Sequence, residues 1–381
     1  MLTPEDGTTL TFQADKMIGT TTNPLVLVNS YEEVQIIQLK KGWNWISFYV
    51  VPKTQTIKQL LNGATKWEVG DALETTKGNS TQMISYKAVQ NKYNKTRMDY
   101  FWDNENDQIT IDPTRMYRFY SINDKKIYIA GEYSPRYIDV NKGWNRVAYN
   151  SKLNLPIATA MADYTERGTE GDIIKSQDAF AVLTADVNNN RSWKGNLTHL
   201  QVGQGYMIKS GADEPLKFLY PIYSGNTRYS GDEAGSRNSE QQAPLFHNAS
   251  ANTMNIIAQA AGIETMKGDR LLVFRGAELC GMTEVNTDSI FFLSVGDTEG
   301  ASEGLSFAIE REGEVIAVTG DQMTYRSNTV VGTVNAPAAI NFATISNMQD
   351  GQWYDIQGRK LAGKPTRKGV YIYNGQKTIV E

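Results

Sequence analysis

A tandem repeat is the feature that most restricts how this chain can fold. The string Lys41–Trp45 (KGWNW) returns as Lys142–Arg146 (KGWNR), and each copy follows an alternating strand. A repeat with a period of about one hundred residues is typical of one folding unit copied in tandem. It predicts two β-rich modules, over 31–133 and 134–221. Each copy is followed in order by a helical patch (Ile57–Leu61, Ile157–Tyr164), a Gly-Asp pair (Gly70-Asp71, Gly171-Asp172) and a turn with a tryptophan (Trp102, Trp193).

A second, shorter repeat joins the two ends of the chain. Leu10–Thr20 matches Met323–Thr333 without gaps, and the same offset places Pro24 against Pro337. The C-terminal copy closes a series of short strands separated by Gly, Asp and Glu turns, which predicts a β-sandwich over 246–343. The expected strands are Thr253–Gln259, Arg270–Phe274, Ile290–Val295, Leu305–Ile309 and Val315–Val318.

The N-terminal copy of this repeat has no such strands before it. A final strand without its sheet would leave backbone groups unpaired. We therefore expect residues 1–30 to be the trailing strands of a truncated sandwich, and the chain to be the back part of a longer protein. The start of the chain has neither the basic nor the apolar region of a signal peptide, which under this interpretation says nothing about compartment.

Composition supports an all-β fold with minor helix and antiparallel sheets. Among 381 residues the chain has 20 Tyr, 7 Trp and 32 Gly, and aromatic residues favour pleated strands while glycine favours turns. The stretch 222–245 is rich in Ser, Gly, Asn and Gln and is expected to be a linker. Residues 344–381 alternate in a strand, glycine turn and strand, which predicts a small terminal β-unit.

Charge and hydropathy exclude two classes of partner. The net charge is −4 with no basic stripe, so nucleic acid is not expected as a partner. No run of 18 apolar residues occurs, so no membrane span is expected. The single cysteine, Cys280, forms no intrachain disulfide.

The tail resembles a known kind of export signal. Tyr354–Arg359 (YDIQGR) followed by Lys368–Ile372 (KGVYI) is similar to the C-terminal sorting regions of proteins exported by the Por (type IX) machinery of Bacteroidetes. This resemblance covers about thirty residues and implies an extracellular or outer-surface location, with the export machinery as a partner. The chain lacks the longer sandwich that normally accompanies such a signal, so two interpretations stay open: a working sorting signal, or a relict with export through a general route.

The tandem modules resemble Gly-Trp-Asn repeats of large surface proteins from the same bacteria. Trp193–Leu197 (WKGNL) and Gly203–Lys209 (GQGYMIK) carry the resemblance in the second module. The first module departs from it, because Thr114–Tyr117 (TRMY) stands in place of the latter element. Residues 246–343 resemble a sandwich module of such proteins through Gly268-Asp269 and Glu278–Gly281. These resemblances imply location and architecture, and they imply no reaction.

Side chains with catalytic chemistry form no recognisable set. His199 and His247 are the only histidines, and neither has a cysteine near it in sequence, so a zinc site is not expected. Cys280 between Leu279 and Gly281 is interpreted as a small buried residue. No nucleophile elbow occurs, and with 42 acidic residues no carboxylate pair stands out as that of a glycosidase. We therefore expect no enzyme and no cofactor.

Calcium is the one metal that the sequence suggests. Asp186, Asn188 and Asn190 follow the opening spacing of an EF-hand loop. Such a loop also requires Gly at its sixth position and Glu at its twelfth, where this chain has Arg191 and Leu197. This run, like Asp103–Asp107, is better interpreted as a hairpin turn.

Three aromatic residues are candidates for ligand binding: Trp45, Trp193 and Tyr206. Exposed Trp and Tyr rings can stack on sugars, whereas a ring at a position repeated in each module is expected to be the centre of its core. Because Arg146 replaces Trp45 in the second copy, the position of Trp45 is expected to face solvent, which makes Trp45 the better candidate.

The expected function is that of a non-catalytic structural or adhesive segment of a bacterial secreted or surface protein that recognises an extracellular glycan or protein. The alternative is an accessory binding region of a larger secreted protease or glycosidase whose catalytic domain lies upstream. An exposed aromatic platform would favour glycan recognition, and buried tryptophans would favour a scaffold.

Overall fold

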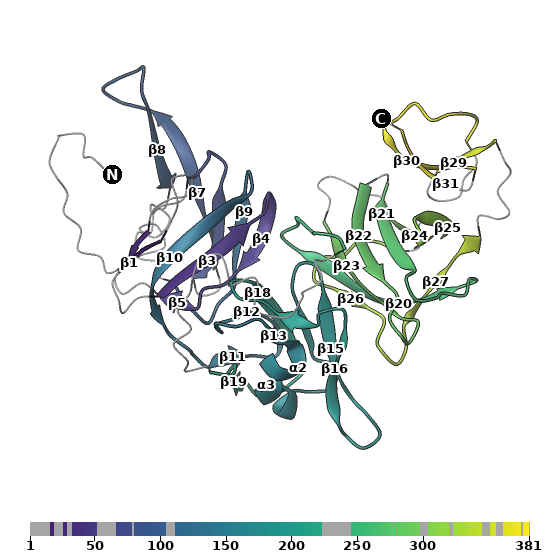
Figure 1. Ribbon diagram of the computed structural model, residues 1–381, viewed down its shortest axis with the longest axis horizontal. Helices are drawn as coiled ribbons and strands as arrows, with labels where there is room; N and C mark the ends of the chain where they lie inside the picture. The colour runs from purple at the N-terminus through teal and green to yellow at the C-terminus, as the bar shows by residue number, and fades with distance from the viewer. Residues whose placement is uncertain are drawn as a thin grey trace.

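The computed structural model is an all-β protein, as predicted (Figure 1). Within the described residues the only helices are α2 (Ile157–Ala160) and α3 (Ala162–Arg167), inside the predicted helical patch Ile157–Tyr164 or adjoining it. The structure describes residues 16–18, 26–28, 33–51, 66–77, 80–103, 111–222, 245–276, 278–297, 304–319, 323–344, 351–355, 361–374 and 376–380. The patch Ile57–Leu61, most of 1–30 and nearly all of the expected linker lie outside this part of the chain.

Strands β3 to β10, here called the first module, form two sheets around one core. A five-stranded sheet has the order β4-β9-β6-β7-β8, and a smaller one has the order β3-β10-β5. Trp102, Phe119 and Ile129 are fully buried between them. The strands are β3 (Glu33–Leu39), β4 (Gly42–Ile46), β5 (Val50–Val51), β6 (Ala72–Lys77), β7 (Ser80–Gln90), β8 (Met98–Asp103), β9 (Tyr117–Ser121) and β10 (Lys125–Tyr133).

Strands β11 to β19, the second module, repeat this topology. The order β12-β18-β14-β15-β16 corresponds strand for strand to β4-β9-β6-β7-β8, and β11 pairs with β19 as β3 pairs with β10. The strands are β11 (Ile138–Val140), β12 (Gly143–Ala148), β13 (Leu155–Pro156), β14 (Ile173–Lys175), β15 (Phe180–Ala185), β16 (Arg191–Gly195), β17 (His199–Leu200), β18 (Gly205–Ser210) and β19 (Leu216–Phe218).

The repeated Gly-Trp-Asn string forms the turn that starts β4 and β12. Gly42 and Gly143 have φ of +94° and +89°, a conformation that favours glycine. Asn44 closes the turn by accepting the Lys40 N–H at 2.8 Å and donating to the Lys40 carbonyl at 2.7 Å. Asn145 makes the same two bonds to Asn141, at 2.9 and 2.7 Å. The string is therefore a structural device that fixes the entry to the edge strand.

The Gly-Asp pairs form a second repeated turn, which the sandwich shares. The buried carboxylates of Asp71, Asp172 and Asp269 each accept the N–H of the residue three positions earlier, at 2.8, 2.8 and 2.9 Å. Each aspartate also makes an interaction particular to its own module: with Lys125, with the Tyr164 hydroxyl, and with Arg311. A buried carboxylate with such partners holds the start of the following strand in place.

The predicted sandwich is present between residues 253 and 344. One sheet has the order β23-β20-β26, with β27 also on β20, and the other has the order β22-β21-β24-β25-β28. Side chains of both sheets share one core. Strands β26 and β27 run parallel to β20 and are exceptions to the antiparallel pairing. The strands are β20 (Thr253–Ala261), β21 (Arg270–Arg275), β22 (Glu278–Glu284), β23 (Phe291–Gly296), β24 (Leu305–Arg311), β25 (Glu314–Val318), β26 (Val330–Val331), β27 (Ala338–Asn341) and β28 (Ala343–Thr344).

The C-terminal residues form a three-stranded sheet that packs on the sandwich. Strands β29 (Trp353–Asp355), β30 (Gly369–Tyr373) and β31 (Gln376–Val380) pair in chain order. Tyr354 and Ile372 are buried against the outer face of the sheet that contains β21 and β24. At the other end of the chain, β1 (Lys16–Ile18) and β2 (Val26–Val28) pair with each other.

Candidate functional site

The second module lies between the first module and the sandwich (Figure 1), and the junction contains the most unusual chemistry of the described residues. Two rows of side chains face each other there. In the first module Trp45, Arg118 and Glu74 are cross-strand neighbours on β4, β9 and β6. In the second module the equivalent row on β12, β18 and β14 is Arg146, Met207 and Lys175.

The two rows meet with pseudo-twofold symmetry. Glu74 at the end of one row forms an ion pair with Arg146 at the start of the other, at 2.7 Å. Reciprocally, the ammonium of Lys175 lies 5.7 Å from the centre of the Trp45 ring. Such reciprocal contacts between equivalent positions define an isologous interface.

Backbone hydrogen bonds obey the same symmetry. The N–H of Ser47 donates to the carbonyl of Gly203 at 2.9 Å, and the N–H of Ala148 donates to the carbonyl of Thr114 at 3.0 Å. Ser47 and Ala148 are equivalent in the repeat, as are Gly203 and Thr114. The two modules therefore dock as a two-fold dimer of equivalent units would, within a single chain.

The junction holds more positive than negative charge. Arg118, which is 4% exposed, lies 3.5 Å from Glu74 and donates to the Asn252 side chain at 2.8 Å. Burial, with Arg146 nearby, lowers the pKa of Arg118 to about 10. Glu74 is thus shared by two arginines, and removal of this one carboxylate would leave a buried excess of cations.

Lys175 is a fully buried lysine whose three hydrogen-bond acceptors are neutral. Its Nζ donates to the carbonyl and hydroxyl of Thr253, at 3.1 and 3.2 Å, and to Oδ1 of Asn328 at 3.2 Å. The Trp144 ring lies 4.6 Å away. Burial, and secondarily Arg118, lowers the pKa of Lys175 to about 7. This ammonium therefore contacts the sandwich, the Trp144 ring of its own module and the Trp45 ring of the first module.

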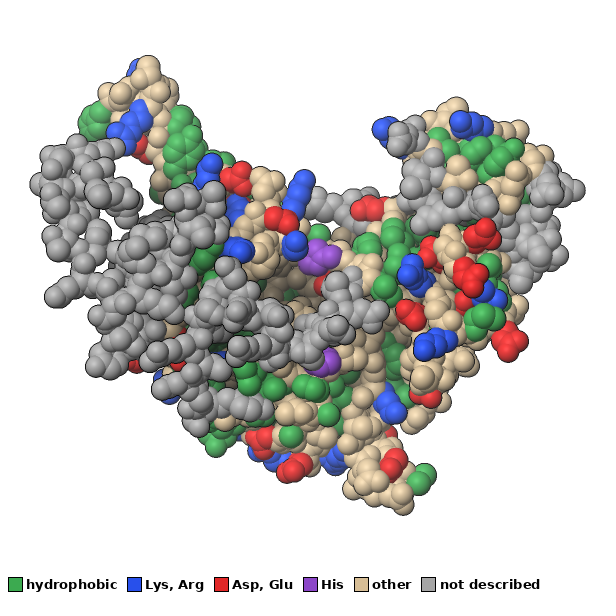
Figure 2. Space-filling model, in the orientation of Figure 1, with side chains coloured by type: hydrophobic (Ala, Val, Ile, Leu, Met, Phe, Trp, Pro, Cys, Tyr) green, Lys and Arg blue, Asp and Glu red, His purple; other side chains and the backbone are tan. Residues whose placement is uncertain are grey.

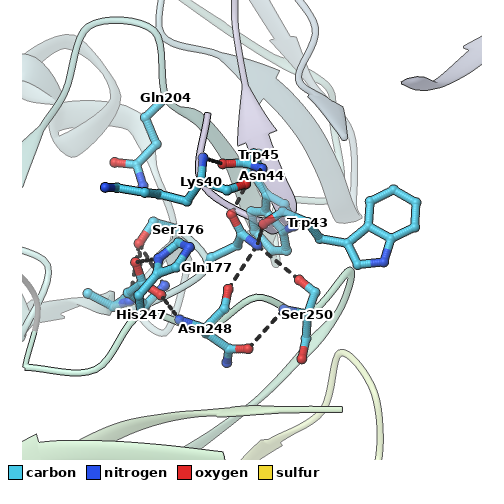
Figure 3. A network of polar contacts seen from close by, with 12 residues as sticks. Lys40, Trp43, Asn44, Trp45, Ser176, Gln177, Gln204, His247, Asn248 and Ser250 are labelled. Carbon is cyan, nitrogen blue, oxygen red and sulfur yellow. Dashed lines mark hydrogen bonds and ion pairs between the residues drawn. The ribbon is translucent and has the colours of Figure 1, made fainter. Parts of the chain in front are cut away.

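Gln177 closes the exposed edge of β4 (Figure 3). Its Oε1 accepts the Trp45 N–H at 2.8 Å and its Nε2 donates to the Trp43 carbonyl at 2.8 Å. The same Nε2 lies 3.0 Å from the carbonyls of Asn248 and Ser250. The side-chain amide thus takes the place of a neighbouring strand on an edge that would otherwise offer unpaired backbone groups.

Neither histidine belongs to a metal site among the described residues. His247 lies 3.3 Å from Asp178 on the loop between β14 and β15, and the hydrogen bond with Asp178 raises the pKa of His247. His199 contacts the hydroxyl of Thr198 at 3.1 Å. Cys280 is buried, and burial raises the pKa of its thiol to about 12, which keeps it protonated and unreactive.

None of the three candidate aromatic residues is exposed: Tyr206 and Trp193 belong to the core of the second module, and Trp45 lies where the first module contacts the second. Trp45 is 2% exposed, so the expectation that it faces solvent is wrong: its ring is covered by Met207, and its Nε1 donates to the Ala251 carbonyl. Tyr206 is fully buried, and its hydroxyl bonds to the Gln201 N–H at 2.7 Å. Trp193 is half-buried beside Tyr164 and donates to Thr165 at 2.8 Å.

The candidate calcium ligands form the turn between β15 and β16. The Asp186 carboxylate accepts the N–H groups of Asn188 and Asn190 and the Asn190 amide, all at 2.8 Å. These bonds, led by that of the Asn190 side chain, lower the pKa of Asp186. The carboxylate is thus used within its own turn. The related run at Asp103 continues outside the described residues.

Sequence reasoning missed Glu74, Arg118, Lys175 and Gln177. One signal was present, because the repeat aligns Glu74 with Lys175, and a reversal of charge at equivalent positions is what complementary faces require. Comparison of the chain with family models, curated proteins and solved structures finds no match. Among the described residues, none forms a helix long and apolar enough to cross a bilayer.

Proposed function

We propose that this chain is a non-catalytic structural and adhesive segment of a bacterial secreted or cell-surface protein, in which docked β-modules hold binding surfaces at fixed relative positions. The junction of three modules is the observation that carries this proposal. It is formed by buried charged and aromatic groups whose interactions cross module boundaries, and such groups specify one arrangement of their partners.

The tryptophans also support a scaffold. All seven lie in the described residues and none is exposed: Trp45 and Trp102 are buried, and the other five are partly buried. Several of them contact a neighbouring module, as Trp144 does by donating to the Asn328 carbonyl at 3.0 Å. Burial of the tryptophan side chains therefore stabilises the fold and its junctions.

Small-angle X-ray scattering on the full chain tests the scaffold role. We expect the wild-type scattering curve to fit one compact arrangement, and the Glu74→Gln variant to have a larger radius of gyration. Asp213→Asn is the matched control, since its ion pair with Lys142 is exposed on both sides. A wild-type curve that requires freely moving modules would refute the proposal.

Location is tested on the bacterium that makes the protein. An antibody against the full chain should label intact cells or the culture medium, and protease added to intact cells should remove the cell-bound signal. Labelling only after permeabilisation would contradict an exterior role. Hydrolysis of a polysaccharide or protein by the purified chain would contradict a non-catalytic one.

A further inference from the structure

The two modules carry equivalent hairpins that differ in length. Tyr86 pairs with Trp102 across β7 and β8, as Leu183 pairs with Trp193 across β15 and β16. From this pair toward the turn, the pairing of β15 with β16 ends at Ala185 with Arg191. The pairing of β7 with β8 extends further, to Gln90 with Met98. The longer hairpin projects from the first module (Figure 1).

The surfaces of the two hairpins also differ. The β7–β8 hairpin exposes six large apolar or aromatic side chains: Met83, Val89, Tyr93, Met98, Tyr100 and Phe101. On the β15–β16 hairpin the only exposed side chain of this kind is Val187. Because the same fold carries a polar hairpin at the equivalent place, folding does not require the apolar surface of β7–β8. By strand alternation Met98 and Tyr100 lie on one face of the hairpin, and Val89 and Phe101 lie on the other, so each face offers apolar side chains to a ligand.

Aromatic rings lead outward from the core of the first module along one face of β7–β8. Trp102 is fully buried, and Tyr86 lies 5.4 Å from it. Tyr100 then stacks on Tyr86 with ring centres 6.4 Å apart and planes inclined by 19°. Since Tyr100 is 57% exposed, the series ends in a ring that is positioned by its neighbour and accessible to solvent.

The tip of this hairpin is basic in a chain of net negative charge. Lys92, Lys95 and Arg97 are exposed, and the chain as a whole carries a net charge of −4. Arg97 forms an ion pair with Asp99, while neither lysine forms an ion pair with a described residue. Tyr93, which is 91% exposed, lies under the Lys92 ammonium at 5.9 Å. Figure 2 shows basic side chains beside hydrophobic ones on this projection.

We propose that the β7–β8 hairpin binds an acidic polysaccharide, which deepens the adhesive role proposed above and rests on it. The apolar faces of sugar rings would stack on Tyr93 and Tyr100, and carboxylate or sulfate groups on the sugars would pair with Lys92 and Lys95. Aromatic rings beside ammonium groups that form no ion pair with a described residue suit such a ligand.

Binding of the full chain to polygalacturonate, dextran sulfate and neutral dextran tests the proposal. We expect the wild type to bind at least one of the two acidic polymers and to bind dextran at least about tenfold more weakly. Tyr93→Ser with Tyr100→Ser should weaken binding about tenfold or more. Lys92→Gln with Lys95→Gln should weaken it and reduce its dependence on salt. Val187→Ser in the equivalent hairpin is the matched control.

The result is decisive in each direction. No binding to either acidic polymer, equal binding to dextran, or equal loss in the Val187→Ser control would overturn the proposal. So would a protein partner whose capture depends on Tyr93 and Tyr100 while the polymers do not bind. The two proposals fail in different measurements. Polymer binding by the hairpin variants tests only the ligand, and the scattering of the wild type and of Glu74→Gln tests only the scaffold, because the exposed hairpin substitutions should leave the radius of gyration unchanged.

Discussion

Met116 occupies the space in front of Gly205, its own counterpart in the other module. A Cβ added to Gly205 would lie 2.2 Å from the Met116 Cγ and 2.8 Å from the Ile46 carbonyl oxygen. The Met116 side chain of the first module therefore fills space that Gly205 leaves open at the equivalent position of the second module. This difference favours pairing of unlike copies, because two copies with methionine at this position would collide.

Gly205→Val is expected to separate the two modules. The added side chain meets both a side chain and the backbone, and overpacking of this kind costs about 1–3 kcal/mol or more. The expected results are a lower unfolding midpoint and a larger radius of gyration. Gly211→Ala is the control, since its Cβ would make only ordinary contacts at 3.6 Å. Equal effects of the two substitutions would show that the contact with Met116 is unimportant.

Glu74→Gln should destabilise the junction more than loss of any exposed carboxylate. Glu74 is the partner of both Arg118 and Arg146, and removal of one partner of a buried pair costs about 3–5 kcal/mol. Asp213→Asn, which breaks an exposed pair, should change the free energy of unfolding by less than about 1 kcal/mol. Urea unfolding followed by tryptophan fluorescence compares the two. A Glu74→Gln variant as stable as the control would contradict the ionic role of Glu74.

Much of the fold could be predicted from the sequence because repeats and strand alternation are local patterns. The strands of the sandwich from Thr253 to Val318 were predicted to within a few residues, except that β22 (Glu278–Glu284) was not identified as a strand. Its central Cys280-Gly281 interrupts the alternation, and a bulge at its pairing with β21 accompanies the interruption.

The junction could not be predicted because its partners are far apart in sequence. The strand of Trp45 by itself, with Arg146 at the same place in the second copy, predicts exposure. In the structure the two residues occupy equivalent places on faces that pack against each other, so Trp45 is buried and the polar Arg146 is only partly exposed. Burial at a contact between modules leaves no periodic signal in either strand.

Gln177→Glu should weaken the junction at neutral pH, and the junction should regain its stability in acid. The amide nitrogen of Gln177 contacts three carbonyl oxygens, and a carboxylate there would repel all three. Protonation at low pH restores a donor, so stability relative to the wild type should increase as pH falls. Hydrogen exchange at the Trp45 N–H, which bonds to Gln177, is the local measurement.

Gln38→Glu is the control for this substitution. Gln38 also donates to a backbone carbonyl, that of Lys125 at 3.2 Å, but it is exposed, and water can replace the lost bond. Exchange at Trp45 should be unchanged in this variant at every pH. If Gln177→Glu also leaves hydrogen exchange at Trp45 unchanged, the amide of Gln177 does not hold the edge of β4.

Lys175 should make the wild-type chain more stable as pH rises above neutrality. Its pKa is about 7 in the folded chain, against an ordinary value of 10.5. Between these values the unfolded chain binds more protons than the folded chain, so the free energy of unfolding increases with pH. Below pH 7 both states are protonated and this dependence ends. The expected rise, measured from pH 7 to about pH 9, is on the order of 1–3 kcal/mol.

Lys175→Met separates this effect from those of other groups. Methionine retains contact with Trp45 and Trp144 but cannot titrate. The difference in the free energy of unfolding between the wild type and the variant should therefore change with pH over the same range. Because the Lys175 ammonium lies 4.6 Å from the Trp144 ring, wild-type tryptophan emission should also titrate near pH 7 and the variant's should not. A wild-type emission spectrum constant from pH 6 to 9 would mean that Lys175 keeps its proton at the junction, held by Thr253 and Asn328.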